Sequence, residues 1–91
     1  MNADFRWNDW NRDHVTQHGV SIDEAEAAVR QASAPWPAYI GDGKYRVYGA
    51  GTGGRIVHVI FLKDEDGTLF IIHARAVISK GEKRRVRRRR K

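Results

Sequence analysis

With 91 residues the chain is expected to form one small domain, and its lack of cysteine excludes disulfides and thiolate metal ligands. No apolar run approaches the length of a membrane helix and the first residues hold no signal-peptide core, so we expect a cytoplasmic protein. The charge is uneven: residues 80–91 hold nine Lys or Arg against one Glu, whereas residues 1–79 carry a net charge of −2. This asymmetry predicts a body formed by residues 1–79 and a basic helix or tail that binds an anionic partner; a solvated tail without a target is the alternative.

Two helices are predicted in the first third of the chain, after a short aromatic segment at residues 5–7 that favours an edge strand. Residues 9–18 are typical of a helix, and Gly19 marks its end. Ser21 followed by Glu24 has the spacing of a capping box, which predicts that a second helix begins directly after Ser21.

The remainder is predicted to be β-structure followed by a third helix. A hairpin centred on residues 41–44 precedes two apolar strands at residues 55–62 and 68–75, and Ser79 followed by Glu82 repeats the capping-box spacing. We therefore expect an α+β fold with two N-terminal helices, an antiparallel meander of three to four strands and a basic C-terminal helix. With the N-terminal helices on one face of the sheet, the other face is expected to be free for function.

Side-chain alternation assigns the two faces of the expected sheet. Apolar rows are expected to face the helices, formed in the last two strands by Val57, Val59, Phe61, Phe70, Ile72 and Ala74. The opposite face then collects basic and aromatic side chains, namely Arg46, Tyr48, His58, His73 and Arg75. An exposed strand face usually favours Thr, Lys and Glu, so this group indicates a functional site; the alternative is that each member is solvated or paired with an Asp.

Arginine and histidine without a metal suit the cleavage of RNA by internal transesterification. Histidine can take the 2′-hydroxyl proton or protonate the leaving 5′-oxygen, and arginine stabilises the charge on the pentacovalent phosphate. The candidate catalytic residues are Arg46, His58, His73, Arg75 and His18. The candidate RNA-binding residues are Tyr48, Arg55, Lys83, Arg84, Arg85, Arg87 and Arg88. A base can stack on an exposed aromatic side chain, for which the candidates are Trp36, Tyr45 and Tyr48.

Other chemistries find less support in the sequence. The segment GAGTGGR at residues 49–55 lacks the lysine and the following helix of a phosphate-binding loop, so it is predicted to be a turn. His14 and His18 are four residues apart, a spacing that can bind zinc, but no clear third ligand accompanies them. We therefore predict neither a metal nor a cofactor.

Five blocks of the sequence, in order, resemble the BrnT-type toxins. The first is FRWNDWNRDHVTQHGVSIDEAE, and it is followed by YRVYG, GGR, HAR and SKGEKRR, so that the resemblance covers residues 5–86. By position, Arg46 and Arg75 match basic residues expected at the family's active face, whereas Val86 stands where the family usually carries an aromatic residue.

The resemblance implies a RelE-like fold and a metal-independent ribonuclease that inhibits translation. It also implies an antitoxin partner, expected to combine an acidic segment with a DNA-binding domain. Such a partner occludes the toxin and represses their operon with it, so the chain is expected to contact DNA only through the antitoxin.

Two other functions stay open at the level of sequence. One is a non-catalytic nucleic-acid binder, in which the basic segment at residues 80–91 supplies the affinity through contacts with phosphates. The other is a protein-interaction module whose basic helix docks on an acidic, antitoxin-like partner.

Overall fold

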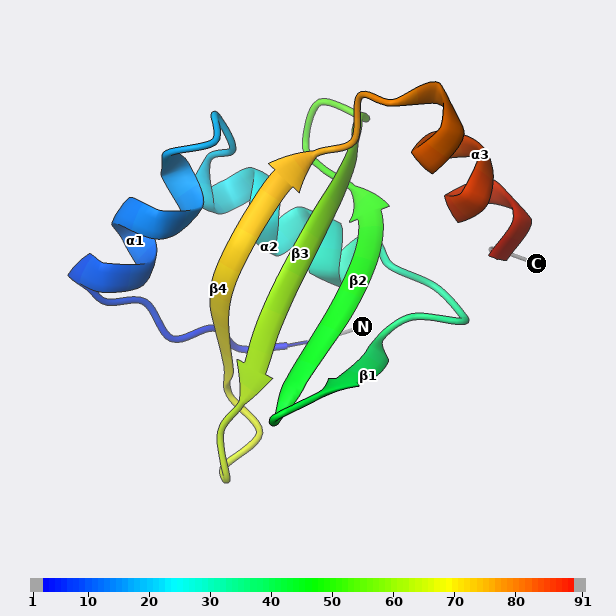
Figure 1. Ribbon diagram of the computed structural model, residues 1–91. Coiled ribbons are helices and arrows are strands. Elements are labelled where there is room, and N and C mark those ends of the chain that lie inside the picture. Colours follow the sequence, from blue (N-terminus) through cyan, green and yellow to red (C-terminus); the bar gives the residue numbers. More distant parts are fainter. Residues whose placement is uncertain (1–2, 90–91) are drawn as a thin grey trace.

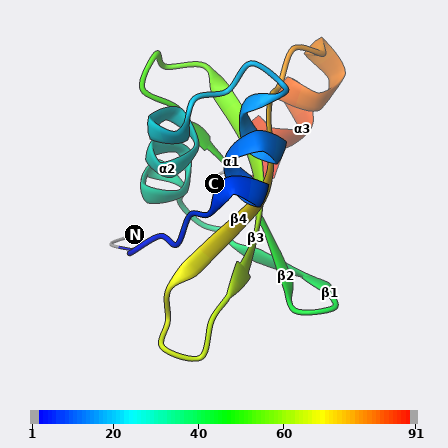
Figure 2. The same cartoon turned by 90° about the vertical axis from the view of Figure 1, so that its left-hand side faces the viewer.

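The computed structural model describes residues 3–89, with side chains to residue 86. Its helices are α1 (Asp9–Thr16), α2 (Ile22–Gln31) and α3 (Lys80–Arg89). Its strands form one antiparallel sheet in the order β1 (Ala38–Gly41), β2 (Lys44–Ala50), β3 (Ile56–Lys63) and β4 (Leu69–Ala76). The sheet lies between α2 and α3, and α1 runs beside its β4 edge (Figure 1, Figure 2). The predicted α+β class is thus confirmed, and no helix within the described range is long and apolar enough to cross a membrane.

Hydrogen bonds from polar side chains fix the starts of the first two helices. The Asn8 side chain accepts from the N–H of Asn11 at 3.1 Å, and Ser21 Oγ accepts from the N–H of Glu24 at 3.0 Å. The second bond confirms the predicted start of α2. Helix α1 ends at Thr16, earlier than predicted.

The first described residues run along β4 without forming a full strand. Phe5 makes a single parallel bridge with Leu69, and the N–H of Arg6 donates to the Leu69 carbonyl at 2.8 Å. The strand predicted at residues 5–7 is therefore reduced to one bridge, because Asn8 already caps α1.

Asn11 connects α1 to β4. Its side chain is fully buried, and its Nδ2 donates to the backbone carbonyls of Arg6 at 3.1 Å and Ile71 at 3.0 Å. Its Oδ1 accepts from the N–H of Asn8 at 2.7 Å, which completes the capping of α1. One side chain therefore satisfies three backbone groups where the N-terminal segment, the helix and the sheet meet.

Replacing Asn11 with alanine is expected to lower the free energy of unfolding by about 2–3 kcal/mol, because the buried carbonyl of Ile71 and the partly buried carbonyl of Arg6 lose their donor. Replacing Asn8 with alanine weakens the cap alone, with an expected loss of about 1 kcal/mol. Urea unfolding of both variants gives the comparison. Equal losses in the two variants would show that the bonds of Asn11 outside the cap contribute nothing.

The hydrophobic core lies between the sheet and the two N-terminal helices. The segment containing α1 and α2 contributes Val15, Val20, Ala25, Ala28 and Val29. The sheet contributes Val47, Val57, Val59, Phe61, Leu69, Ile71 and Ala74. In β2 the helix-facing row continues at Gly49, where a Cβ would overlap the carbonyl of Ala28 on α2. The absence of a side chain at this position allows helix and strand to pack directly against each other.

Strand β4 contains a bulge that alternation did not predict. Ile60 pairs with His73 and Phe61 pairs with Ile71, so Ile72 has no partner on β3. The extra residue reverses the predicted faces for the part of the strand that precedes it.

The bulge corrects the predicted assignment of β4. Leu69 and Ile71, not Phe70 and Ile72, take the predicted places in the core between sheet and helices. Phe70 is buried on the other side of β4, where its ring stacks on Trp10 of α1 with centroids 6.0 Å apart. Beyond the bulge the predicted order returns: Ala74 is fully buried, and its two neighbours point to the outer face.

The outer face of the sheet was predicted to be free, but α3 covers part of it. Val86 of α3 is 3% exposed, and Glu82 is bonded to side chains of β2 and β4. The helix lies on the side of the sheet opposite to α2 (Figure 2). The basic C-terminal helix therefore covers part of the face on which the site was predicted.

Candidate active site

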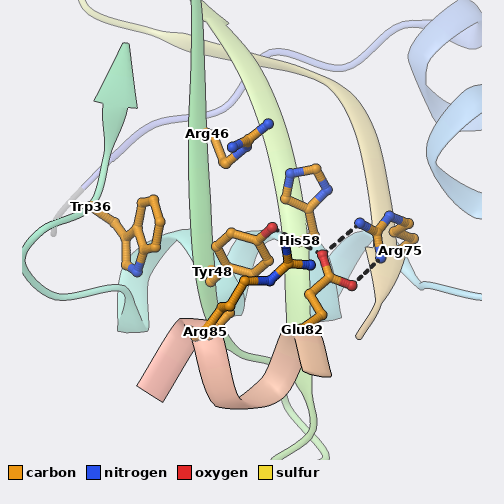
Figure 3. Close-up of a pocket in the computed structure, with 8 residues that line it drawn as sticks. Trp36, Arg46, Tyr48, His58, Arg75, Glu82 and Arg85 are labelled. Carbon is orange, nitrogen blue, oxygen red and sulfur yellow. Dashed lines mark hydrogen bonds and ion pairs between the residues drawn. The ribbon is translucent and has the colours of Figure 1, made fainter. Parts of the chain in front are cut away.

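A pocket of about 660 Å³ lies on the outer face of the sheet, beneath α3 (Figure 3). Strands β2, β3 and β4 supply one wall through Arg46, Tyr48, His58 and Arg75. Helix α3 supplies the opposite side through Glu82, Arg85 and Val86. Trp36, from the connection between α2 and β1, also lines the pocket. Segments far apart in the sequence thus converge on one cavity.

The register of the sheet places three of these side chains in one row. Tyr48 pairs with His58, and His58 pairs with Arg75, so the row crosses β2, β3 and β4. Arg46 lies on the same face of β2 because it is two residues from Tyr48. The sheet therefore brings together four of the residues that alternation placed on this face.

His58 is the most unusual group in the pocket. The residue is 5% exposed, and neither ring nitrogen has a hydrogen-bond partner among the described residues. Burial, and then the positive charges of Arg75, Arg46 and His73, lower its pKa to about 4. At neutral pH the imidazole is therefore neutral and offers a ligand one N–H donor and one lone pair.

Glu82 of α3 reaches across the pocket to the sheet. Its Oε1 accepts from Arg75 Nη1 at 3.0 Å, and its Oε2 accepts from Arg75 Nη2 at 2.8 Å and from the Tyr48 hydroxyl at 3.0 Å. These bonds, with Arg75 as the main cause, lower the pKa of Glu82 to about 2. Burial and the nearby carboxylate raise the pKa of Tyr48, which therefore keeps its proton at neutral pH.

Arg46 differs from Arg75 in having no ion pair with a carboxylate of the described residues. Its Nε is buried without a hydrogen-bond partner among those residues. The pocket wall therefore holds one guanidinium neutralised by Glu82 and one that is available to an anion.

A row of rings leads from the pocket toward α1. The centroid distances are 5.0 Å from Trp36 to Tyr48, 4.8 Å from Tyr48 to His58, 5.6 Å from His58 to His73, and 5.4 Å from His73 to His18. Burial, and then the charges of neighbouring basic groups, lower the pKa of His73. The predicted candidates His73 and His18 thus adjoin the pocket through His58 and do not line it.

Arg55 lies elsewhere. Its Nε and Nη2 bond to the Glu24 carboxylate at 2.7 and 2.8 Å, and Nη2 also donates to the Gly19 carbonyl at 2.9 Å. These contacts tie the turn between β2 and β3 to the start of α2. This predicted RNA-binding residue does not line the pocket, and its guanidinium is paired with the carboxylate of Glu24.

The remaining predicted RNA-binding residues belong to α3. Arg85 lines the pocket, Arg84 is exposed and Lys83 is half-buried. Arg87 and Arg88 fall within α3, but their side chains lie outside the described part of the structure. The sequence indicated for Glu82 only a place in a capping box; Ser79 Oγ does accept from the Glu82 N–H at 3.3 Å, but the Glu82 carboxylate is bonded to Arg75 and Tyr48.

His14 in α1 and His18 in the turn that follows it contact different neighbours. The His14 ring stacks on Trp10 with centroids 3.9 Å apart, whereas the His18 ring lies against His73. Within the described residues, no group of three or more His, Asp or Glu is arranged to hold a metal ion.

Fold and site together define a small α+β domain with a cationic pocket between its sheet and its C-terminal helix. The chain matches no protein-family model, no curated protein and no solved structure.

Acidification is expected to destabilise the fold through His58. The unfolded chain protonates this residue near its ordinary pKa of 6.5, but the folded chain does so only near 4. Its contribution to stability is present above the unfolded value and is lost as the pH falls toward 4, by about 3 kcal/mol in total. His73, whose pKa is also lowered, acts in the same direction. Protonation of Glu82 lowers the free energy of unfolding further, but only below the ordinary pKa of this residue, 4.5.

Urea unfolding at about pH 7 and about pH 5 measures this dependence. The free energy of unfolding is expected to fall clearly in the wild type and by much less in His58→Phe, which cannot take up the proton. An equal fall in the two proteins would assign the pH dependence to other groups.

Proposed function

We propose that this chain is a metal-independent endoribonuclease and the toxin of a BrnT-type toxin–antitoxin pair with a RelE-like fold. The observation that carries the enzymatic part is His58: a buried, neutral imidazole whose two ring nitrogens have no hydrogen-bond partner among the described residues, in a pocket that also holds Arg46 and Arg75. A buried imidazole without partners destabilises a fold, so its presence in a cavity favours a role toward a ligand. The resemblance of residues 5–86 to the BrnT-type toxins supplies the family and the substrate class.

The pocket suits attack by the ribose 2′-hydroxyl on the neighbouring phosphorus. His58 takes the hydroxyl proton, the 2′-oxygen bonds to phosphorus, and the bond from phosphorus to the 5′-oxygen breaks. Arg46 and Arg75 stabilise the negative charge that builds on the phosphoryl oxygens. Tyr48, which is protonated at neutral pH, is our candidate for the acid that protonates the 5′-oxygen. The products are a 2′,3′-cyclic phosphate and a 5′-hydroxyl.

Substrate binding makes His58 a better base. In the free protein burial, and then the charges of Arg75 and Arg46, lower its pKa. A phosphate placed between the two guanidiniums offsets the contribution of those charges, so the pKa of His58 is higher when RNA is bound. The imidazole is therefore weakly basic without substrate and becomes an effective proton acceptor in the complex.

Incubation of the purified protein with total RNA in the presence of a chelator tests the proposal. The wild type is expected to produce fragments with 2′,3′-cyclic phosphate ends, and Arg75→Ala or Arg46→Ala to slow cleavage by about 10²–10³-fold. Arg12→Ala is the control, because Arg12 is exposed on α1 and forms no ion pair with a described residue. The enzymatic function would be refuted if the wild type cleaved neither free RNA nor mRNA bound to translating ribosomes.

The proposed antitoxin follows from the charge of α3. Its exposed basic side chains favour a partner with an acidic segment, and the pair would contact operator DNA through that partner. If the proposal holds, co-expression of a short neighbouring reading frame with an acidic segment restores growth to cells that produce this chain.

Non-catalytic RNA binding is a second candidate function, favoured by the exposed Arg84 and half-buried Lys83 on α3. On this alternative, RNA affinity falls steeply with salt and Arg75→Ala changes nothing. RNA cleavage by the wild type that is lost in Arg75→Ala excludes it.

A further inference from the structure

The carboxylate of Glu82 is bound as a ligand anion would be. Arg75 presents two parallel N–H donors to its two oxygens at 3.0 and 2.8 Å, and the Tyr48 hydroxyl adds a third donor at 3.0 Å. A guanidinium binds carboxylate and phosphate with the same forked geometry. The position that Glu82 occupies is therefore suited to two oxygens of a phosphodiester.

Glu82 is also the one acidic residue in an otherwise basic segment, residues 80–91. Glu82, Arg85 and Val86 share one face of α3 because they are three and four residues apart, and all three line the pocket. Without the carboxylate, this face would bring Arg85 toward Arg46 and Arg75, an arrangement opposed by charge repulsion. Among the described contacts, α3 is held to the sheet by one carboxylate and one buried valine.

We propose that Arg75 and Tyr48 form the phosphate-binding position of the pocket and that Glu82 occupies it in the free protein as an internal competitor. Binding of a phosphodiester displaces Glu82 and shifts α3 away from the outer face of the sheet. The identity of the ligand as RNA rests on the proposed function, whereas the competition for an oxyanion position rests on the contacts of Glu82 alone.

Displacement has two consequences for the site. The Tyr48 hydroxyl loses its carboxylate acceptor and becomes free to donate to the substrate. The apparent affinity for a phosphodiester is lower than the intrinsic affinity, by the fraction of molecules in which Glu82 has left the position. Removing the charge of Glu82 should therefore strengthen binding of the phosphodiester, although the substitution adds no contact to the ligand.

Catalysis by Glu82 is the alternative reading of its position. Both oxygens already accept hydrogen bonds, and the bonds with Arg75 and Tyr48 keep its pKa near 2, so the carboxylate is a poor proton acceptor at neutral pH. A displaced competitor and a catalytic base predict opposite effects of substitution on turnover, which makes them separable.

The test compares Glu82→Gln with Glu65→Gln, which changes the net charge equally. Glu65 is exposed in the turn between β3 and β4 and has no described partner. The probe is a short 2′-deoxyoligonucleotide, which lacks the attacking hydroxyl, with inorganic phosphate as the minimal ligand. Glu82→Gln is expected to bind both about tenfold more tightly than Glu65→Gln, and Glu82→Asp, which keeps the charge on a shorter arm, to fall between them.

Equal affinities in Glu82→Gln and Glu65→Gln would overturn the inference. So would tighter binding joined to RNA turnover about 10²-fold below wild type at saturating RNA, because that result assigns Glu82 to the chemistry. If the wild type cleaves no RNA but Glu82→Gln binds phosphate more tightly, the internal competition stands and the proposed function fails. Circular dichroism of each variant confirms that α3 and the sheet are retained.

Discussion

Replacing His58 with phenylalanine is expected to abolish RNA cleavage while leaving the free energy of unfolding unchanged or higher. His58 is 5% exposed, and neither ring nitrogen has a partner in the part of the chain that the structure describes, an arrangement that disfavours the fold by about 1–3 kcal/mol. A phenyl ring of similar size fills the same space without polar atoms. Cleavage is expected to fall by about 10²–10⁴-fold, because the proton acceptor is lost.

The control for this prediction is Val59→Ala, the next residue on β3 but on the core side of the sheet. Val59 is fully buried, so its truncation should lower stability by about 1–3 kcal/mol. Cleavage by the folded fraction should change little. Urea unfolding and an RNA cleavage assay on the same samples measure both quantities. Loss of stability in His58→Phe would make His58 a structural residue. Cleavage of RNA by this variant would exclude His58 as the proton acceptor.

Replacing Gly49 with alanine is expected to destabilise the fold by more than about 3 kcal/mol, enough to leave much of the protein unfolded. A Cβ at this position would overlap the carbonyl of Ala28, which is backbone and cannot rotate away. Relief requires α2 to move off β2, and that movement opens the core around Val29 and Val47.

Gly53→Ala is the matched control, since a Cβ there meets no atom within 4 Å. It should unfold at the wild-type urea concentration. Thermal or urea unfolding followed by circular dichroism gives the comparison, and a Gly49→Ala protein as stable as Gly53→Ala would contradict the close packing of α2 on β2.

Local sequence signals predicted much of this architecture. The start of α2 followed from the spacing of Ser21 and Glu24, because a helix cap involves residues only three positions apart. The grouping of Tyr48, His58 and Arg75 followed from alternation, because strands without a bulge between the compared positions keep one face throughout.

Contacts between distant segments could not be predicted in the same way. The bulge at Ile72 depends on how β4 pairs with β3 and packs against the helices, and no local pattern in β4 marks it. The role of Glu82 depends on α3 folding back over the sheet to reach Arg75. Arg55 suggested RNA contact by its charge alone, but its partner Glu24 lies 31 positions away in the sequence.

The bulge at Ile72 has a consequence for the lengths that β4 can take. The strand holds two alternating patterns out of phase, one ending at Ile71 in the core and one starting at His73 on the pocket side. Deleting Ile72 would join the two patterns into one regular alternation, in which Ile71 stays in the core and His73 and Arg75 stay on the pocket side. Deleting Ala74, beyond the bulge, would instead turn Arg75 toward the core. A deletion in β4 is therefore tolerated at the bulge and excluded beyond it, and the exposed turn at residues 65–67 can change length without affecting either part of the strand.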